Sequence, residues 1–332
     1  MANRIIAGAL AAALVFGLGG PAAAQDKRTF TFGYDQPKTT GYGFAADVFQ
    51  KKLEELSGGA LSINQFPGGQ LGQEPQMLQK VRSGDIDFII TATANGATLT
   101  PQMGVLSLHY LFEDAEHLKR AIASPELNGA IKALVDETVD GAKVLTLLTL
   151  GFRNIYAKFE IHSVADVNGK KSRVQATKTE DTHFPAYGVT PVHMPFGEVY
   201  TSLQTGVVDM AENGVNVYLS NKHYEVAPVM SFTEHEANNN VIWVSQKTWD
   251  SLTDQQREWV AAAAAEVGAR EPAYALQLEL DSAEKLKKIG VKIVSDVDKS
   301  GFIAAAKPIQ DRLAADLGPR AVEILGIVRG LK

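Results

Sequence analysis

Strands and helices alternate at short, regular spacing near the start of the chain, and this alternation constrains the fold more than any other feature. Polar and apolar residues alternate from Thr29 and the run reaches a glycine just before Tyr34, which predicts a strand over Thr29–Tyr34. Apolar spacing predicts a helix over 44–56, and short apolar runs predict strands over 60–66 and 87–91, with part of a helix over 77–81. This order indicates an α/β domain with a largely parallel sheet.

The same kind of pattern continues without obvious sequence repetition. Pro272 interrupts a long alanine-rich segment over 254–280, and we expect it to kink a helix there. Because no Pro/Ser-rich linker separates the halves, we expect two α/β lobes with several chain crossings. The other expected elements are strands over 143–150, 172–176, 189–194, 241–244 and 291–294, and a helix over 198–205.

The N-terminus has the order of a secretory signal. Arg4 is its only charged residue, an uncharged apolar run follows over 5–18, and Ala22-Ala23-Ala24 supplies an A-x-A exit. The run is too short for a permanent span of a bilayer of about 30 Å. A buried N-terminal helix is the alternative, but no polar face marks one. We predict a signal peptide over 1–24, cleavage after Ala24, and export to a periplasm.

Composition excludes several classes of function. Lys+Arg is 32 and Asp+Glu is 38, so the net charge is −6, and a chain of this kind with no basic run is a poor nucleic-acid binder. Cysteine is absent, which excludes disulfides, thiol nucleophiles, thiolate zinc sites and iron–sulfur clusters. The 45% hydrophobic content is that of a globular protein.

The chain contains partial matches to motifs for cofactor and metal binding, but none of these motifs is complete. Residues 41–46 match G-x-G-x-x-A, but the preceding loop is long and Asn64 stands where a dinucleotide site needs an acid. His235-Glu236 begins H-E-x-x, but the fifth residue is Asn239, so a zinc helix is not indicated. The seven histidines lack metal-ligand spacing, and no G-x-S-x-G or Walker loop is present. We therefore expect no metal, no cofactor and no enzymatic activity.

A long ordered set of motifs resembles the solute-binding subunit of TRAP transporters, the DctP-like family. The set comprises FPGGQLG at 66–72, VRSGDIDF at 81–88, GFRN at 151–154, DVNGKKSRVQ at 166–175, YGVTPVHMPFGEVYTSLQTGVVDMAEN at 187–213 and KHYEVAP at 222–228. The resemblance covers nearly the whole exported chain. Departures are Ser172, Met210, Gly214 and the run His109-Tyr110-Leu111-Phe112, where the family often has Pro-Phe-Leu-Phe.

The resemblance implies a two-lobed periplasmic-binding-protein fold. Each lobe would be a mixed, mostly parallel sheet flanked by helices, with a long helix linking the lobes. We place lobe I at 25–150 plus about 239–278, and lobe II at 151–238 plus about 279–332. The implied function is capture of a small carboxylate-containing organic acid, dicarboxylates included, and delivery to the small and large TRAP permease subunits. We expect a monomer.

Arg173 corresponds to the arginine that clamps the ligand in this family. A guanidinium presents a planar fork that matches a carboxylate bidentately. The alternative is a strand-end arginine paired with a nearby acid. Arg153 lies where the family often places a second cation, and a salt bridge between the lobes is the alternative role.

Other side chains are expected in the same cleft. Asn213 suits a carboxylate or hydroxyl because an amide both donates and accepts, and Glu212 is expected to orient an arginine. Phe196 and Trp243 would wall the ligand, although each is equally compatible with a core position. Loops beyond the carboxyl ends of strands supply the N-terminal lobe's candidates, which are Gln36, Thr40, Tyr42, Gln73, Glu74, Thr93 and Asn95, with His193 and Tyr187 as weaker candidates.

Two other functions stay open from sequence alone. One is a periplasmic sensor component that passes ligand occupancy to a receptor. The other is a secreted α/β enzyme acting on organic acids, against which the lack of a nucleophile–base motif argues.

Overall fold

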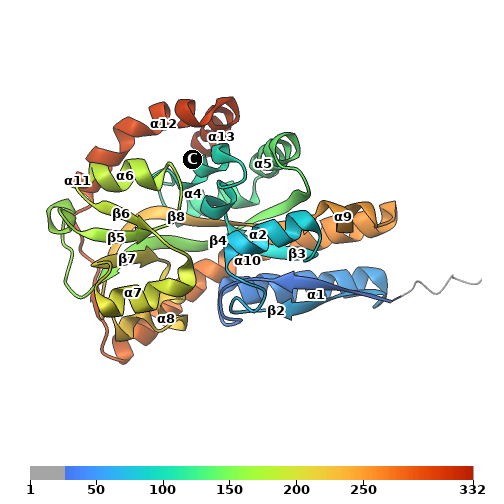
Figure 1. Ribbon diagram of the computed structural model, residues 1–332, viewed down its shortest axis with the longest axis horizontal. Helices are drawn as coiled ribbons and strands as arrows, with labels where there is room; N and C mark the ends of the chain where they lie inside the picture. Colours follow the sequence, from blue (N-terminus) through green and yellow to red (C-terminus); the bar gives the residue numbers. More distant parts are fainter. Residues whose placement is uncertain (1–26, 332) are drawn as a thin grey trace, which may run out of the picture.

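The computed structural model describes residues 27–331, arranged as two α/β lobes joined by long strands and one long helix (Figure 1). The predicted signal peptide over 1–24 lies outside these residues, so its cleavage after Ala24 stays a prediction. No helix within 27–331 combines the length and the apolar character needed to cross a bilayer.

The first lobe contains the strand–helix alternation predicted from the sequence. Its elements are β1 (Arg28–Gly33), α1 (Gly41–Ser57), β2 (Leu61–Phe66), α2 (Glu74–Ser83) and β3 (Phe88–Ala92). β1 pairs in parallel with β2 on one side and β3 on the other. The three predicted strands and both helices are confirmed to within a few residues.

Two long strands carry the sheet from one lobe into the other. β4 (Ala142–Ala157) and β8 (Val229–Ser245) pair antiparallel along most of their length, and the whole sheet has the order β2-β1-β3-β8-β4-β7-β5-β6, with β9 on β8. The sequence predicted only 143–150 and 241–244. Both strands were therefore predicted too short. Register shifts near Gly151 and polar residues such as Asn239 interrupt the apolar pattern on which the prediction depended.

The second lobe is built around short parallel strands. β5 pairs in parallel with β6 and β7, and β9 pairs in parallel with β8, whereas β7 pairs antiparallel with β4. Its elements are η2 (Val164–Val167), β5 (Lys171–Val174), α6 (Glu180–Ala186), β6 (Thr190–His193), η3 (Phe196–Glu198), α7 (Val199–Thr205), β7 (Met210–Asn213), α8 (Val215–Ser220), η4 (His223–Glu225) and β9 (Lys292–Val294).

Helix α10 (Asp254–Lys288) packs on elements of both lobes. It contacts α1 and β4 in its first part and α8 and β9 further on, so it is the linking helix that the sequence predicted. It continues without a break through Pro272 and ends eight residues beyond the predicted Leu280. Pro272 is itself buried, and packing of the helix on β4 and α1 holds the segment helical despite the missing N–H.

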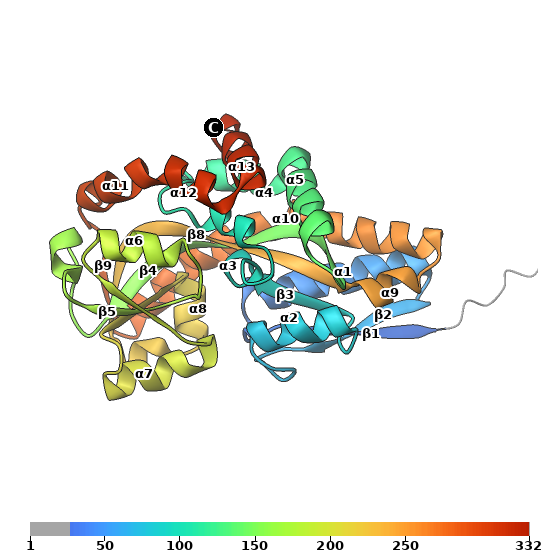
Figure 2. The same cartoon turned by 45° about the horizontal axis from the view of Figure 1, so that its top comes forward.

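Among the remaining helices, α4, α5, α11, α12 and α13 lie together at the top of Figure 2. Helices α12 and α13 pack with α4 and α5 in one apolar cluster, which contains Leu118, Leu134, Leu313 and Ile324. The lobe boundaries given above stay a prediction. The elements are α3 (Thr93–Gly96), η1 (Pro101–Ser107), α4 (Ala115–Ala123), α5 (Pro125–Thr138), α9 (Gln246–Asp250), α11 (Ser300–Ala306), η5 (Lys307–Ile309), α12 (Gln310–Leu317) and α13 (Pro319–Gly330).

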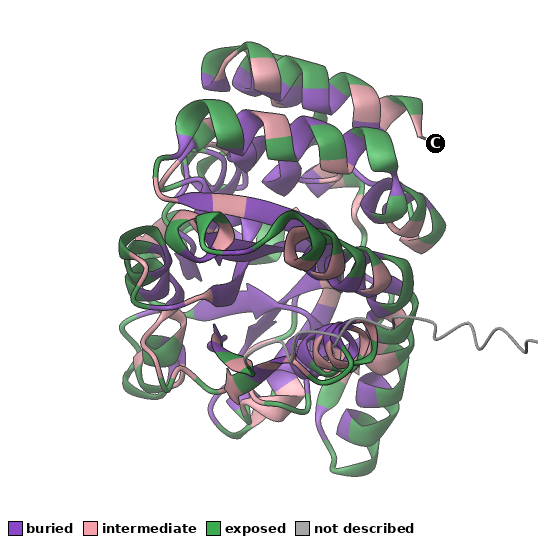
Figure 3. Ribbon diagram, turned by 90° about the vertical axis from the view of Figure 1, so that its right-hand side faces the viewer, coloured by how far each residue is buried: buried purple, intermediate pink, exposed green. Residues whose placement is uncertain are grey.

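The sheet is buried on both faces (Figure 3). In the first lobe, α1 and α10 cover one face with an aromatic-rich cluster that includes Phe32, Phe49 and Phe88. The other face packs against α2, α4 and α5. Coverage on both sides explains why the central strand β3 is almost continuously apolar.

Glu271 is a buried carboxyl in the middle of α10. Its Oε2 accepts the Thr149 backbone N–H at 3.1 Å, whereas its Oε1 has no hydrogen-bond partner among the described residues. Burial raises the pKa of Glu271 well above its ordinary value. The folded state therefore holds a proton that the unfolded state releases, and stability falls as pH rises above the ordinary glutamate pKa.

We expect Glu271→Gln to remove this pH dependence, because the amide keeps the acceptor for Thr149 and carries no charge. The gain in unfolding free energy over the wild type should be larger at pH 8 than at pH 5, as measured by urea denaturation. Glu258→Gln, on the exposed face of the same helix, is the matched control. An equal gain at both pH values would show that Glu271 does not hold the extra proton.

Candidate functional site

The ends of several strands meet around a small polar cavity between the lobes. Asp35 and Gln36 follow β1, Asn95 lies in α3 directly after β3, and Arg173 and Asn213 lie in β5 and β7. Sheets of this type bind ligands beyond the carboxyl ends of their strands. The inner cavity has a volume of about 20 Å³, room for about one water, and an adjoining outer cavity has about 190 Å³.

Apart from the two weaker candidates, the cavities bring together eight of the thirteen residues predicted to lie in the cleft. The inner cavity is lined by Asp35, Gln36, Tyr42, Glu74, Ala92, Asn95, Leu150, Arg153, Arg173, Gln175, Phe196, Asn213, Val217 and Asn238. The outer cavity shares Asp35, Glu74, Asn95, Arg173 and Phe196, and adds Pro75, Ala176, His193, Met194 and Pro195.

Arg173 is a buried cation without an acidic partner. Its Nε and Nη2 donate to the carbonyl oxygen of Met194 at 3.1 and 3.0 Å, and its guanidinium lies 5.8 Å from the centre of the Phe196 ring. No carboxylate within residues 27–331 forms an ion pair with it. Burial lowers the pKa of Arg173 below the ordinary arginine value, although a guanidinium remains charged at neutral pH. The site therefore holds one positive charge that is free to meet an anion.

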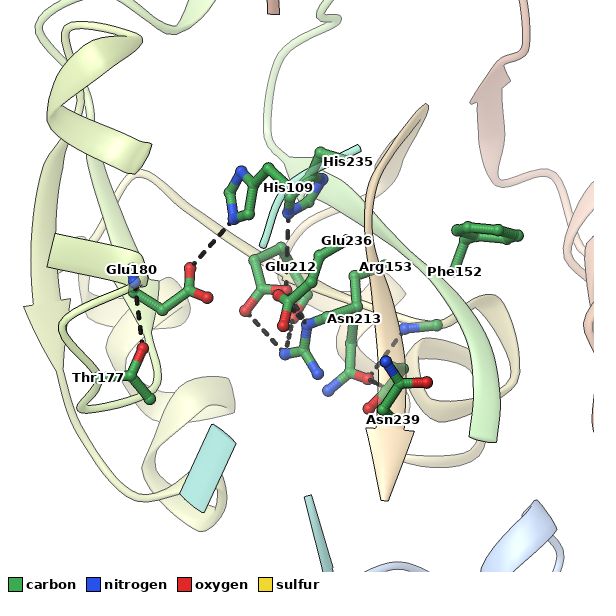
Figure 4. Close-up of polar contacts among 12 residues, drawn as sticks. His109, Phe152, Arg153, Thr177, Glu180, Glu212, Asn213, His235, Glu236 and Asn239 are labelled. Atoms are coloured by element: carbon green, nitrogen blue, oxygen red, sulfur yellow. Dashed lines mark hydrogen bonds and ion pairs between the residues drawn. The ribbon is translucent and has the colours of Figure 1, made fainter. Parts of the chain in front are cut away.

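Arg153, in contrast, is fully paired. Its Nε donates to one carboxylate oxygen of Glu212, and its Nη2 donates to the other at 2.7 Å (Figure 4). Glu236, across the sheet on β8, lies 3.4 Å from the same Nε. Burial disfavours the charged guanidinium, but the negative charge and hydrogen bonds of Glu212 outweigh the effect of burial. The pKa of Arg153 is therefore raised above the ordinary arginine value. Arg153, the second cation of the cleft, thus belongs to a structural ion pair, and its side chain also lines the cavity.

The opposite side of the cavity is acidic. Glu74 Oε2 accepts the Ala92 N–H at 2.9 Å and the Asn95 amide at 2.7 Å, and Oε1 accepts the Tyr42 hydroxyl at 3.1 Å. Burial raises the pKa of Glu74, and burial together with the neighbouring Glu74 raises the pKa of Asp35 well above its ordinary value. These carboxyls favour neutral polar groups over a second anion.

Buried amides form the floor of the cavity. Asn238 Nδ2 donates to Asn213 Oδ1 at 2.8 Å, and Asn240, outside the cavity lining, has its Oδ1 2.6 Å from the Tyr42 hydroxyl oxygen. Asn213 lies on β7 and Asn238 on β8, the two strands that flank β4. Each amide can both donate and accept, so the floor can bind hydroxyl groups.

Two hydrogen bonds join the lobes beside the cavity. The Gly197 N–H donates to Gln73 Oε1 at 2.8 Å, and Asn221 Nδ2 donates to Gln36 Oε1 at 3.0 Å. Both bonds connect a loop of the first lobe with a segment of the second. The described conformation is therefore the closed one.

Five predicted residues do not line either cavity, and one of them, Gln73, forms the bond to Gly197 described above. Trp243 is fully buried in the core and donates from its indole N–H to Thr91 Oγ1 at 2.8 Å. Thr93 donates to the Asn239 carbonyl, and Thr40 donates to the Pro37 carbonyl at the start of α1. Glu212 orients Arg153, as the sequence predicted.

The two weaker candidates have separate places. His193 lines the outer cavity and pairs with Asp181 at 2.8 Å. Tyr187 is buried away from both cavities and contacts His109. Their roles in binding are not indicated by these contacts.

Sequence reasoning missed Asp35, Gln175 and Asn238. Asp35 directly follows the first predicted strand, and Gln175 follows Arg173 by two residues, so strand-end position was an available signal for both. Asn238 begins a run of three asparagines inside β8. Three amides in a strand buried on both faces mark a place where the strand contacts something polar.

A closed two-lobed α/β fold with a polar cavity between the lobes defines a small-molecule binding protein. The family model for DctP, the bacterial extracellular solute-binding protein family 7, matches residues 32–316, and the chain belongs to this family. Its members are periplasmic proteins that bind small acids and work with TRAP membrane components, so the chain is a binding protein for transport and not an enzyme.

Named relatives show the same class. The 2,3-diketo-L-gulonate-binding periplasmic protein YiaO of Escherichia coli is 29% identical over 308 residues, 92% of each chain. A TRAP solute-binding protein of Xanthobacter autotrophicus with bound β-D-galacturonate is 30% identical with a TM-score of 0.84, covering 91% of this chain and 99% of that one. The sugar acid binding protein of Advenella mimigardefordensis in complex with galactonate is 28% identical with a TM-score of 0.86, covering 92% and 99%.

Replacing the two arginines should destabilise the ligand-free protein to different extents. Arg153→Met leaves Glu212 buried without its cation, which should lower the unfolding free energy by about 3–5 kcal/mol. Arg173→Met removes a buried charge that has no ion-pair partner, so the loss should be smaller. Chemical denaturation without ligand compares the two variants. If Arg173→Met costs as much as Arg153→Met, Arg173 is a structural ion-pair residue like Arg153.

Proposed function

We propose that this protein captures a sugar acid, a molecule with one carboxylate and several hydroxyl groups, in the cavity between its lobes. The observation that carries the proposal is Arg173, a buried cation without an ion-pair partner, facing a cavity whose other side is acidic. The two sides present opposite charges to the two ends of such a ligand.

The carboxylate end of the ligand pairs with Arg173. Both hydrogen bonds of the Arg173 guanidinium go to one backbone carbonyl oxygen, so the guanidinium has no carboxylate bonded to it among the described residues. A ligand carboxylate supplies that partner with a matching planar geometry. Phe196, stacked beside the guanidinium, excludes water from the pair and thereby strengthens it.

The hydroxyl end lies against Asp35, Glu74 and the amide floor. A hydroxyl donates to a carboxylate oxygen and accepts from an amide, so it satisfies both kinds of side chain. A second ligand carboxylate would meet two buried acids and would be repelled. The geometry thus favours a polyhydroxy monocarboxylate over a C4-dicarboxylate.

The relatives' ligands support this choice. Galacturonate and galactonate in the structures named above, and D-erythronate in a TRAP solute-binding protein of Polaromonas that is 26% identical with a TM-score of 0.86, each carry one carboxylate and several hydroxyls. The curated relative YiaO also binds a sugar acid derivative by its name.

Capture requires opening, because the inner cavity of about 20 Å³ does not admit a sugar acid. The bonds Gln73–Gly197 and Gln36–Asn221 break as the lobes part and re-form on closure, when the ligand's contacts with both lobes add to them. The closed protein, a monomer released by cleavage after Ala24, then delivers the ligand to the small and large TRAP permease subunits. No cofactor takes part in this cycle.

Isothermal titration with D-galacturonate and D-glucuronate tests the carboxylate contact. We expect binding by the wild type and a loss of at least about 30-fold in Arg173→Met, because truncating one partner of a buried charge pair costs about 2–5 kcal/mol. D-Galactose, which lacks the carboxylate, should bind neither protein. Equal affinity of the wild type and Arg173→Met for a uronate would exclude the clamp.

The acidic side is tested by ligand preference. Wild-type protein should bind D-galacturonate more tightly than succinate, and Asp35→Asn should narrow that difference by weakening the uronate and relieving repulsion of the second carboxylate. Competition titrations measure the ratio. Asp47→Asn, at an exposed position on α1, is the control. A ratio unchanged by Asp35→Asn would place the selectivity elsewhere.

A further inference from the structure

A second polar cluster lies beside the ligand cavity, beyond the Arg153–Glu212 pair, and the capture function does not account for it. His109, His235 and Glu236 present one ligand-type atom each, and these atoms lie within 4.8 Å of one another (Figure 4). All three side chains are at most 3% exposed. Glu180 Oε2 lies 3.4 Å from His109 Nε2 at the same point.

The atoms that face one another lack hydrogen bonds. His109 Nε2, His235 Nε2, Glu236 Oε2 and both carboxylate oxygens of Glu180 are buried without a hydrogen-bond partner among residues 27–331. Buried polar atoms of this kind are normally satisfied. Within this part of the chain, four of these atoms have only longer ion-pair contacts of 3.4–3.9 Å, with one another, with Arg153 or with Glu212, so a group from outside the chain could supply the missing bonds.

The two imidazoles are fixed in the orientation that a metal ligand needs. His109 Nδ1 contacts the Tyr187 hydroxyl at 2.9 Å, and His235 Nδ1 contacts Thr233 Oγ1 at 2.8 Å. Each contact engages the outer nitrogen and turns Nε2 towards the cluster. Metal-bound histidines are held in the same way by hydrogen bonds to their other nitrogen.

Charge gives an independent reason. Arg153 is the cation that contacts this cluster, whereas Glu180, Glu212 and Glu236 are all buried within it or against it. With every carboxylate ionised, these four residues carry a net charge of about −2, and an uncompensated buried charge is strongly unfavourable. A divalent cation among these atoms would compensate this charge when every carboxylate is ionised.

We propose that His109, His235, Glu236 and Glu180 bind one divalent transition-metal ion of the zinc type. Two imidazoles and two carboxylates suit Zn²⁺ in tetrahedral coordination. Ligand bonds of about 2.0–2.2 Å require the side chains to move inward by about an ångström. The ion would join the loop after η1 to α6 and β8, three elements that meet beside the cleft.

The sequence did not predict this site because its ligands are not near one another in the chain. His235-Glu236 lies on strand β8 instead of the helix that the H-E-x-x-H motif requires. His109 comes from the run in which this chain departs from its family's usual Pro-Phe-Leu-Phe. The fold alone brings the two segments together.

Titration of the full exported chain with ZnCl₂ after chelator treatment tests the proposal. We expect one Zn²⁺ per chain in the wild type, and an affinity at least about 100-fold lower in His109→Gln and in the isosteric Glu180→Gln. Tyr187→Phe, which loses only the contact to Nδ1, should bind about 10–100-fold more weakly. Replacing Zn²⁺ with Co²⁺ should give the visible absorption of a four-coordinate site.

His162→Gln, at an exposed histidine, should bind as the wild type does. Circular dichroism and the thermal midpoint show whether each variant is folded. If His109→Gln is not folded, Glu180→Gln provides the test of a metal ligand. Absence of stoichiometric Zn²⁺ binding by the wild type would overturn the proposal. Equal affinity of the wild type and the folded ligand variants would overturn it as well. Neither result bears on sugar-acid binding, which is measured separately.

Discussion

The buried pair between Arg153 and Glu212 is the interaction on which the rest of the cleft depends. Arg153 lies on β4, Glu212 on β7, and Glu236 opposite Arg153 on β8. A buried ion pair is stable only when its geometry is tightly fixed, so this triad requires the three strands to keep their register. Asn213, next to Glu212, and Asn238, close to Glu236, thereby receive fixed positions in the cavity floor.

The long strands β4 and β8 explain how two lobes share one site. They run through both lobes and form a wall of the cavity that the lobes share. Leu150 and Arg153, both on β4, line the cavity from this wall. Arg173 and Phe196 come from the second lobe, and Asp35 and Glu74 from the first. Opening the lobes therefore separates the cation from the acidic side, whereas the amide floor stays in place.

Local patterns predicted much of this arrangement. The strand–helix alternation was predicted because each element has its own periodicity, and Tyr42 and Glu74 were expected because they stand on loops beside strand ends. Arg173 was expected from the family resemblance, since its spacing alone did not favour a ligand contact. Lining of the cavity by these residues is a property of the fold, and their binding role remains a proposal.

Other features depend on tertiary contacts that no local pattern contains. The length of β8 was missed because Asn238 and its neighbours are polar inside a buried strand, where they satisfy one another and Tyr42. Trp243 has the character of a pocket residue in sequence but lies in the core. The cluster around His109 unites three distant segments, and the acidic side unites two, at Asp35 and Glu74.

A crystal structure of the protein with bound D-galacturonate tests the central claim most directly, because it shows which cation receives the carboxylate. The account predicts a carboxylate paired with the Arg173 guanidinium, hydroxyl groups against Asp35 and Glu74, and an Arg153–Glu212 pair unchanged from that described above. A carboxylate bound to Arg153 with Glu212 displaced, or a ligand lying outside the cavity between the lobes, would contradict it.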